Sequence, residues 1–174
     1  HADAYLSAPI HSMTLYEDTS GSDILLLGAG NEILADTNIS ATPVLAYTQP
    51  DGTAHKFESA RLGKWATIVD GTNPNLKYDG TNFHKLGISS PVASPTVSEL
   101  ADTGEPSGTY IYAYTYVFND GAGYESESAK SNSSVEITVS SKKIGVDVVA
   151  SSDPQVTGIR IYRYSDVSAQ WKTI

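Results

Sequence analysis

The chain has 174 residues, of which 40% are hydrophobic and 18% are charged, and its formal net charge is -9. A chain of this size and apolar content builds one ordinary domain or two small ones around a packed core. The lack of cysteine excludes disulfides and thiolate metal sites, and the balance of 11 basic against 20 acidic residues argues against a protein that grips nucleic-acid phosphates.

The first half of the chain, residues 1–90, consists of short apolar segments separated by turn residues. Segments of about five residues that recur every eight to twelve residues are typical of an all-β sandwich, barrel or propeller. A loose similarity between residues 24–35 and 66–78 is too weak to define a propeller blade. The predicted strands are 13–16, 23–28, 32–36, 44–47, 64–69 and two short strands on either side of Asp79-Gly80.

Residues 88–98 are rich in Ser and Pro and poor in charge, which favours a semi-extended connector. We therefore place a domain boundary there and expect a β-rich propeller- or barrel-like segment at 1–90 and a sandwich at 91–174. The order and spacing of the later strands suit an immunoglobulin-like or fibronectin type III-like sandwich. Its predicted strands are 95–100, 109–118, 134–140, 144–150 and 156–164.

The last strand of that sandwich is missing or short in the sequence after Trp171. Trp171 and Ile174 carry apolar area that no later segment covers, and burial of a large apolar side chain contributes about 1.5 to 3 kcal/mol. We therefore expect the native chain to continue beyond Ile174 with at least one more strand. The opening residue His1, in place of Met, likewise indicates a processed chain or a piece of a longer one.

The segment from Thr109 to Phe118 alternates with a strict period of two, which predicts a strand with successive side chains on opposite faces. The following Asn119-Asp120-Gly121 tolerates positive φ, so we expect a hairpin there. Both faces of the strand are apolar, so we predict that something outside its own sandwich covers part of it. The predicted interface residues are Tyr110, Tyr112, Tyr114, Tyr116 and Trp171.

Three stretches carry a resemblance to known groups of proteins. Residues 108–131 read GTYIYAYTYVFNDGAGYESESAKS and residues 153–165 read DPQVTGIRIYRYS, which resemble sandwich modules in the virion proteins of double-stranded DNA bacteriophages. Residues 65–87 read WATIVDGTNPNLKYDGTNFHKLG and are similar to the tail-tube nozzle proteins of short-tailed phages. The resemblance covers residues 64–165 and implies a structural tail protein, with no catalytic residues to carry over.

The residues that could carry enzyme chemistry are scattered. His1, His11, His55 and His84 lack metal-ligand spacing, and no G-x-S-x-G nucleophile motif occurs. Paired carboxylates for glycoside hydrolysis stay open, because such pairs form only in three dimensions. Most Asp residues lie beside Gly, Ser, Thr or Asn, which favours turn chemistry with an occasional calcium site as the alternative. These residues are Asp18, Asp23, Asp36, Asp51, Asp70, Asp79 and Asp120.

The glycine pair at Gly28 and Gly30 lacks the extension and the following helix of a dinucleotide site, so we interpret it as a hairpin turn. The longest apolar run, about Ile24 to Leu27, is too short for a membrane span. We expect no catalytic residue, no cofactor and no metal.

The function we expect is that of a non-enzymatic structural subunit in a phage tail, which forms a homo-oligomeric ring or nozzle through which the genome passes. Its partners would be copies of itself and other tail proteins such as an adaptor, without specific binding to nucleic acid. The alternative is a secreted or cell-surface carbohydrate-binding or adhesion module, because the chain has eleven Tyr and two Trp whose rings could stack on sugars. In a conduit, the net charge of -9 predicts an acidic or neutral inner wall.

Overall fold

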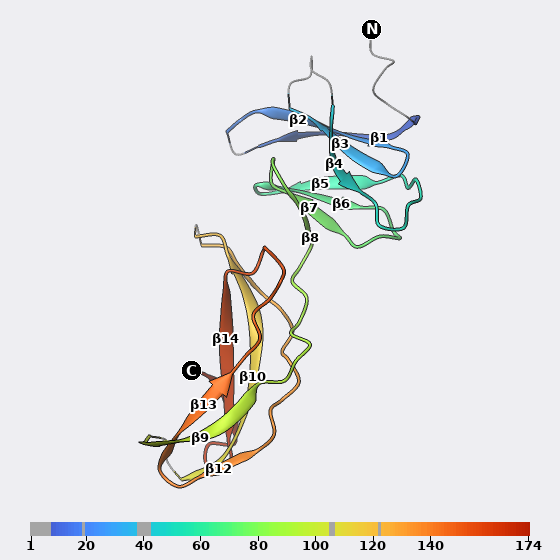
Figure 1. Cartoon of the computed structure of the whole chain (residues 1–174). Coiled ribbons are helices and arrows are strands. Elements are labelled where there is room, and N and C mark those ends of the chain that lie inside the picture. The colour runs from blue at the N-terminus through green and yellow to red at the C-terminus, as the bar shows by residue number, and fades with distance from the viewer. Residues whose placement is uncertain (1–7, 19, 38–42, 105–106, 122) are drawn as a thin grey trace. The chain divides into compact units, whose positions relative to one another are not determined.

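The computed structural model describes residues 8–18, 20–37, 43–104, 107–121 and 123–174. Over these ranges every regular element is a β-strand, and the strands pair in antiparallel sheets (Figure 1). The all-β, sandwich-like fold expected from the sequence is confirmed. The chain divides into two compact units, His1–Leu86 and Gly87–Ile174, and the division falls just before the Ser/Pro-rich segment.

The first unit contains two four-stranded sheets, each with its strands in chain order. The β1–β4 sheet is built from β1 (Ile10–Glu17), β2 (Asp23–Ala29), β3 (Glu32–Asp36) and β4 (Val44–Thr48). The β5–β8 sheet is built from β5 (Glu58–Leu62), β6 (Trp65–Val69), β7 (Leu76–Tyr78) and β8 (Phe83–Lys85). Strand β5 was missed from the sequence, because its residues ESARL carry no apolar alternation.

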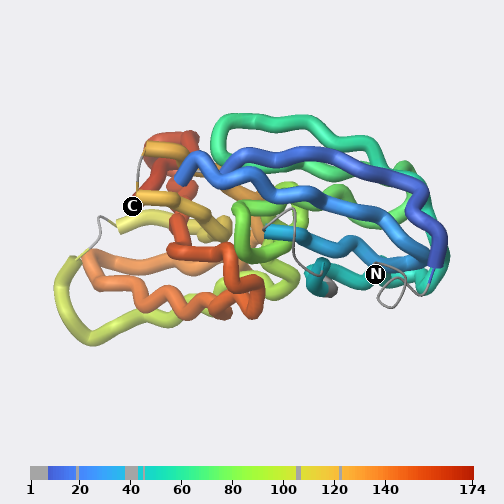
Figure 2. The backbone as a smooth tube through the Cα atoms, turned by 90° about the horizontal axis from the view of Figure 1, so that it is seen from above, coloured from blue at the N-terminus to red at the C-terminus, as the bar shows by residue number. Residues whose placement is uncertain are grey.

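The core of the first unit lies between these two sheets, which Figure 1 shows as stacked layers and Figure 2 shows from above, with the β1–β4 sheet in front of the β5–β8 sheet. The period-two alternation of β2 and β3 sends one set of side chains into this core and the other set to the far face. Tyr16 and Tyr78 meet there edge to face, with ring centroids 5.7 Å apart. The buried members of the core are Tyr16, Ile24, Leu26, Ile33, Ala35, Phe57, Ala66, Ile68, Leu76 and Tyr78.

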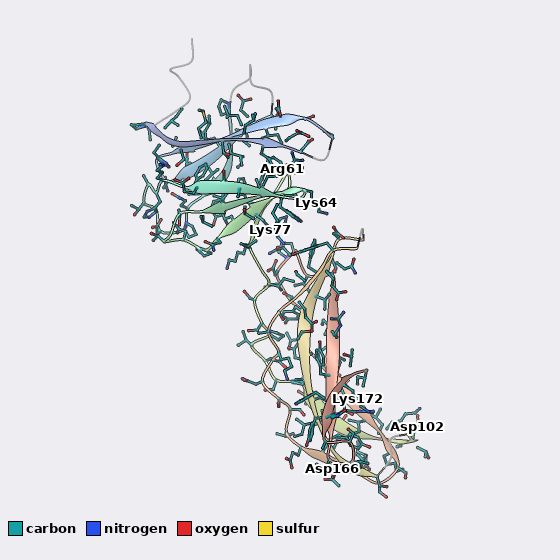
Figure 3. All side chains as sticks on the ribbon, turned by 180° about the vertical axis from the view of Figure 1, so that it is seen from behind. Arg61, Lys64, Lys77, Asp102, Asp166 and Lys172 are labelled. Atoms are coloured by element: carbon teal, nitrogen blue, oxygen red, sulfur yellow. The ribbon has the colours of Figure 1, made fainter. Side chains whose placement is uncertain are left out.

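The two sheets stack with their first strands running in the same direction. Near the start of β1, the Ser12 hydroxyl accepts a 2.8 Å hydrogen bond from the Phe57 N–H, just before β5. At the end of β1, the carboxylate of Glu17 lies 3.6 Å from the guanidinium of Arg61, near the end of β5. The Tyr16 hydroxyl also donates to the carbonyl of Lys64, in the turn that follows Arg61 along the chain (Figure 3).

The last strands of the two sheets are stacked as well, because Tyr47 of β4 contacts Phe83 of β8 with ring centroids 5.6 Å apart. The two stacked sheets therefore have the same strand order and the same strand direction. A shift of one sheet along the stacking direction, rather than a rotation about a two-fold axis, relates it to the other. The face that the β1–β4 sheet turns inward therefore corresponds to the face that the β5–β8 sheet turns outward.

The second unit is organised around the long strand β10 (Gly108–Asn119). On one side β10 pairs with β14 (Gly158–Ser165), which in turn pairs with β15 (Gln170–Thr173). On its other side it pairs with β11 (Glu125–Glu127) and β12 (Ile137–Val139). Strands β9 (Thr96–Thr103) and β13 (Lys142–Asp147) form a separate two-stranded sheet.

The hairpin predicted after the tyrosine strand is confirmed. Asn119 pairs with Glu125, and the connecting glycines Gly121 and Gly123 have φ of 72° and 103°. A positive φ costs a glycine little, because it has no Cβ to clash with the backbone. The predicted strand at 134–140 is shorter than expected, since only Ile137–Val139 pair with β10.

Residues 128–134 run beside β10 in an irregular conformation that we call the serine ladder, formed by Ser128, Ser131 and Ser134. The N–H groups of these serines donate to the carbonyls of Tyr116, Tyr114 and Tyr112 at 2.9, 2.8 and 2.7 Å. Their hydroxyl oxygens accept from the N–H groups of the same three tyrosines, each at 3.0 Å. Each hydroxyl also donates to the carbonyl of the next residue.

The serine hydroxyl therefore stands in for the backbone carbonyl that a regular neighbouring strand would supply. Residues spaced three apart in the ladder meet residues spaced two apart on β10, so the ladder advances less per residue than a strand does. A regular strand in this position would supply its own backbone carbonyls as acceptors for the N–H groups of β10, but this more compact segment supplies serine hydroxyls in their place. The three serines are buried, with 8 to 9% of their surface exposed.

The tyrosines of β10 are core residues of their own unit. Tyr110, Tyr112, Tyr114 and Tyr116 are between 0 and 7% exposed, and the first two pack with Val139. The Tyr116 hydroxyl donates to the Val149 carbonyl at 2.9 Å. These contacts correct the prediction that these tyrosines are covered in part from outside the sandwich. The ladder and the facing strands bury them within one chain.

Candidate interaction surface

The opposite face of β10 is covered by side chains of its own sheet. Residues that are directly paired across neighbouring strands share a face of the sheet. Thr115 pairs with Arg160, and Ile111 pairs with Tyr164, which pairs with Trp171 of β15. Although Thr115 lies on this outer face, it is only 1% exposed. We call this face the β14–β15 face; its polar and aromatic members are Thr115, Glu125, Glu127, Arg160, Tyr162, Tyr164 and Trp171.

The charged half of the β14–β15 face is a closed hydrogen-bond network around Glu127. One carboxylate oxygen accepts from the Thr115 hydroxyl at 2.6 Å and from the Tyr162 hydroxyl at 2.5 Å. The other accepts from Nη1 of Arg160 at 2.5 Å. Nη2 of Arg160 reaches Glu125 at 2.6 Å, so one guanidinium bridges two carboxylates. Charge-assisted bonds of this kind are among the stronger ones in proteins.

This network holds Glu127 as an anion. Burial raises the pKa of Glu127, but hydrogen bonds from Thr115, Tyr162 and Arg160 lower it by more, so the folded pKa lies below the ordinary value. The hydrogen bond from Tyr162 to Glu127 also raises the pKa of Tyr162, because only the neutral phenol can donate it. A carboxylate with both oxygens engaged is a fixed charge. It is poorly placed to act as a general acid or base.

The aromatic half of the face lies at the open edge of the sheet. Tyr164 and Trp171 have ring centroids 5.8 Å apart with planes inclined at 51°. The ammonium of Lys130 lies 4.5 Å from the centre of the Trp171 ring, within range of a cation–π interaction. Trp171 nevertheless remains 38% exposed, and every residue of β15 is exposed. The face thus combines fixed charges with partly exposed rings.

Of the predicted interface residues, Trp171 lies on this surface and the four tyrosines of β10 lie on the opposite side of the sheet. Sequence reasoning missed Glu125, Glu127 and Arg160. A signal was present, since Arg160, Tyr162 and Tyr164 alternate along IRIYRY and two glutamates are spaced by two in ESE. That alternation indicates a shared face but not the partners across it.

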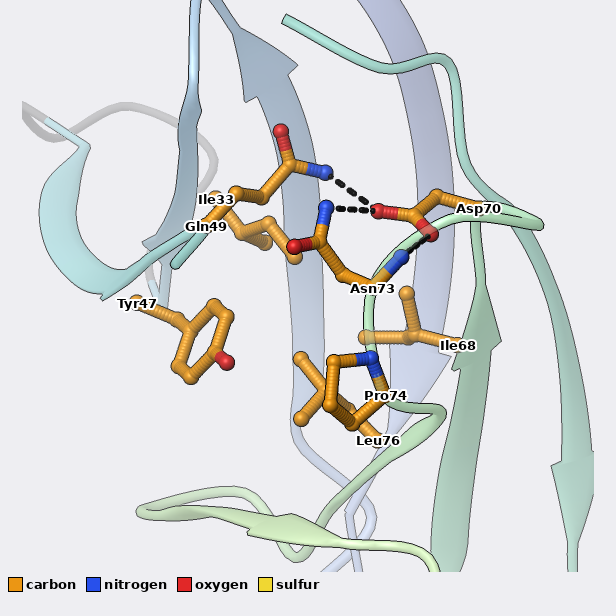
Figure 4. Close-up of a pocket in the computed structure, with 8 residues that line it drawn as sticks. All are labelled: Ile33, Tyr47, Gln49, Ile68, Asp70, Asn73, Pro74 and Leu76. Atoms are coloured by element: carbon orange, nitrogen blue, oxygen red, sulfur yellow. Dashed lines mark hydrogen bonds between the residues drawn. The ribbon is translucent and has the colours of Figure 1, made fainter. Parts of the chain in front are cut away.

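The first unit has a small pocket at one end of its core (Figure 4). Its interior volume of about 10 Å³ is roughly the space that one water molecule needs. Sites for organic ligands are typically about 300 to 1,000 Å³. The residues that line it are Ile33, Tyr47, Gln49, Ile68, Asp70, Asn73, Pro74 and Leu76.

The polar wall of this pocket is a network that ties the loop after β4 to the loop after β6. Asp70 accepts hydrogen bonds from the side chains of Gln49 and Asn73 at 2.9 and 2.8 Å. It also accepts from the backbone N–H groups of Thr72 and Asn73. The pocket is therefore best explained as a structural junction between the two sheets.

The Asp70 junction makes the stability of the first unit sensitive to acid. Burial raises the pKa of Asp70, but hydrogen bonds from Asn73 and Thr72 lower it by more. A depressed folded pKa means that the stabilisation is complete above the ordinary value of about 3.9 and is lost as pH falls through the folded value. We expect urea midpoints to fall below about pH 4, and to fall less steeply with Asp70→Asn, which cannot titrate. Parallel pH profiles for the two proteins would contradict this role.

Most of the predicted turn aspartates cap turns. Asp18, Asp51, Asp79 and Asp120 each accept a hydrogen bond from a backbone N–H two to four residues later. Asp23 and Asp36 instead lie in strands. Gly30 has φ of 60° in the β2–β3 turn, whereas Gly28 lies within β2. Over the described ranges, no group of three His, Asp or Glu residues is placed to hold a metal ion.

His55 and His84 each face a single carboxylate, Asp51 at 2.5 Å and Asp79 at 3.6 Å.

The chain matches no protein-family model, no curated protein and no solved structure. The part of the chain that the structure describes contains no helix long and apolar enough to cross a membrane.

Proposed function

We propose that the chain is a non-enzymatic structural subunit of a bacteriophage tail, which assembles with copies of itself into a ring or tube through which the genome passes. In the virion its further partners are other tail proteins, such as an adaptor. The resemblance of residues 64–165 to tail and nozzle proteins supports the proposal at the level of sequence. The formal net charge of -9 fits a conduit wall that does not hold a nucleic-acid duplex.

The structural observation that carries the proposal is the open edge at β15. This strand is the last in its sheet, and it presents Trp171 on the same face as the ion-paired Arg160. An unpaired edge strand is a template for pairing with another chain. Trp, Tyr and Arg are the residue types enriched in the centre of protein interfaces, because they bury large areas and still satisfy polar groups.

The same face supports a second candidate function, that of a carbohydrate-binding module. Tyr164 and Trp171 expose ring surface on the face that also carries the carboxylate of Glu125, farther along β10, and sugar rings pack on aromatic faces while their hydroxyls bind carboxylates. Fixed side chains favour such binding, because less rotamer freedom is lost on contact.

Substitution of Trp171 separates the two functions. We expect the wild-type chain to form rings visible by negative-stain microscopy, and Trp171→Ser to reduce the particles to monomers without a change in melting behaviour. Tyr124→Ser is the matched control, because Tyr124 is 51% exposed in the hairpin after β10 and should leave assembly intact. A monomeric wild-type chain that binds a glycan array through Trp171 would instead establish the carbohydrate module.

A further inference from the structure

The sheet that contains β10 has a second edge, on the side opposite β15. Over the described residues, β12 pairs with β10 alone, and β15 pairs with β14 alone. Tyr110 of β10 pairs with Ile137 on one side and with Ser165 on the other, and Ser165 pairs with Gln170 of β15. The edges at β12 and β15 therefore lie at the same end of the sheet.

The edge of β15 presents backbone groups of Trp171 and Thr173. In an antiparallel sheet, the N–H and C=O groups of successive residues point alternately to the two neighbouring strands. The N–H of Ile174 donates to the Ile161 carbonyl of β14 at 3.1 Å. By alternation, Trp171 and Thr173 turn their N–H and C=O groups away from β14 and toward the edge.

The edge of β12 presents backbone groups of Glu136 and Thr138 in the same way. The N–H of Tyr112 is bonded to the serine ladder, so Tyr110, two residues earlier on β10, also turns its N–H and C=O toward this side. Its partner there is Ile137. The residues before and after Ile137 therefore direct their N–H and C=O groups to the edge, and both are exposed.

The directions of the two edge strands suit a sheet that continues from one copy to the next. Each neighbouring pair in the order β12–β10–β14–β15 is antiparallel, so β15 runs antiparallel to β12. A copy placed beside β15 in the same orientation brings its β12 antiparallel to that strand, with the same face outward. The alternation of strand direction then stays unbroken across the contact.

The side chains at the two edges match in one register. When Trp171 lies opposite Thr138, Thr173 lies opposite Glu136, so the residues with edge-directed backbone groups face one another. The next position brings Ile174 opposite Val135 on the other face of the sheet. These two aliphatic side chains are 58% and 76% exposed, and apolar pairs across neighbouring strands stabilise a sheet.

Charge also favours contact between the unlike edges. The β15 edge carries Lys172, which is exposed, and the ammonium of Lys130, which lies 4.5 Å from the centre of the Trp171 ring. The β12 edge carries the exposed carboxylate of Glu136. Contact between two β15 edges would bring like charges together, which disfavours it.

We propose that β15 of one copy pairs with β12 of the next copy, so that the sheet continues from chain to chain. A contact between two different surfaces is heterologous, and it closes into a ring or continues as a filament. Relative to a level arrangement, the matching register is offset by two residues along the strands, and closure of a sheet requires such a stagger. The inference rests on the self-assembly in the proposed function and names the partner of the β15 edge.

Introduced cysteines test the contact directly, because the chain has none of its own. Opposite residues of neighbouring strands have Cα atoms about 5.5 Å apart, which a short bis-maleimide cross-linker spans. We expect a mixture of Glu136→Cys and Thr173→Cys chains to give a product of twice the 18.5 kDa chain mass, and neither chain alone to do so. Val92→Cys mixed with Thr173→Cys is the control, because Val92 is 93% exposed in the connector.

Removal of one edge-directed N–H tests the backbone pairing. Proline is tolerated on an edge strand where the N–H points away from the sheet, so Thr138→Pro leaves the backbone bonds of β12 to β10 in place. It should abolish rings in negative-stain images without a change in melting behaviour. Thr138→Val is the matched control, because it also loses the hydroxyl contact with Thr109 but keeps the N–H.

The outcomes separate this inference from the proposed function. Rings that form without a product between positions 136 and 173, or that persist with Thr138→Pro, would overturn the inference and leave the proposed function standing. Cross-linking of Thr173→Cys with itself would show a two-fold contact between β15 edges and would overturn it as well. A wild-type chain that stays monomeric in sedimentation at all concentrations would overturn both.

Discussion

Replacing Ser128, Ser131 and Ser134 together with alanine is expected to unfold the second unit or leave it marginally stable. Each substitution removes the hydroxyl that accepts the N–H of a buried tyrosine on β10. A buried donor left without a partner costs about 1 to 3 kcal/mol, and three such losses approach the total stability of about 5 to 15 kcal/mol for a small domain. Ser and Ala are almost equal in size, so cavity formation contributes little.

Urea denaturation followed by tryptophan fluorescence measures this effect in the second unit alone. Each unit contains one of the two tryptophans, so Trp65→Phe leaves Trp171 as the reporter. Each single substitution, including Ser131→Ala in the middle of the ladder, should lower the free energy of unfolding. Ser133→Ala is the control, since Ser133 lies in the same segment but is exposed. Equal effects of Ser131→Ala and Ser133→Ala would show that the ladder does not contribute to stability.

Replacing Phe57 with alanine is expected to destabilise the first unit by about 3 to 5 kcal/mol, the usual cost of removing a buried phenylalanine. Phe57 is 4% exposed and lies where the chain crosses from one sheet to the other. Its backbone N–H is bonded to Ser12, so the ring is held against the core of both sheets. Thermal unfolding monitored by Trp65, in a Trp171→Phe background, measures the loss.

Gly28 provides the space that the Phe57 ring occupies. A Cβ at position 28 would lie 2.9 Å from the Phe57 ring and 2.6 Å from the His11 ring. Gly28→Ala should therefore cost about 1 to 3 kcal/mol through overpacking. It should cost less in a Phe57→Ala background, where one of the two clashes is gone. Gly158→Ala is the matched control, because nothing lies within 4 Å of its added Cβ. Strict additivity of Gly28→Ala and Phe57→Ala would refute this packing.

Local patterns predicted much of this fold. Strands β2, β3 and β10 follow the period-two alternation of apolar residues, and the turns after β2 and β10 follow Gly, Asn and Asp, which tolerate positive φ or cap the backbone. These features depend on residues a few positions apart, so they can be read directly from the chain. Strand β5 lacks such a pattern and was missed, because its pairing with β6 rather than its own alternation makes it a strand.

Other features depend on residues that are distant in sequence, and only the tertiary structure decided them. Ser128, Ser131 and Ser134 look like part of a polar connector until β10 lies beside them and presents N–H groups that need acceptors. The tyrosines of β10 were expected at an interface, because alternation shows that a strand has two apolar faces but not what covers each face. By itself the sequence determined the all-β character and the turns, which arise from local backbone and side-chain preferences. The burial of the tyrosines, the ion pairs of Arg160 and the shifted stacking of the two sheets arise from packing between segments far apart in the chain.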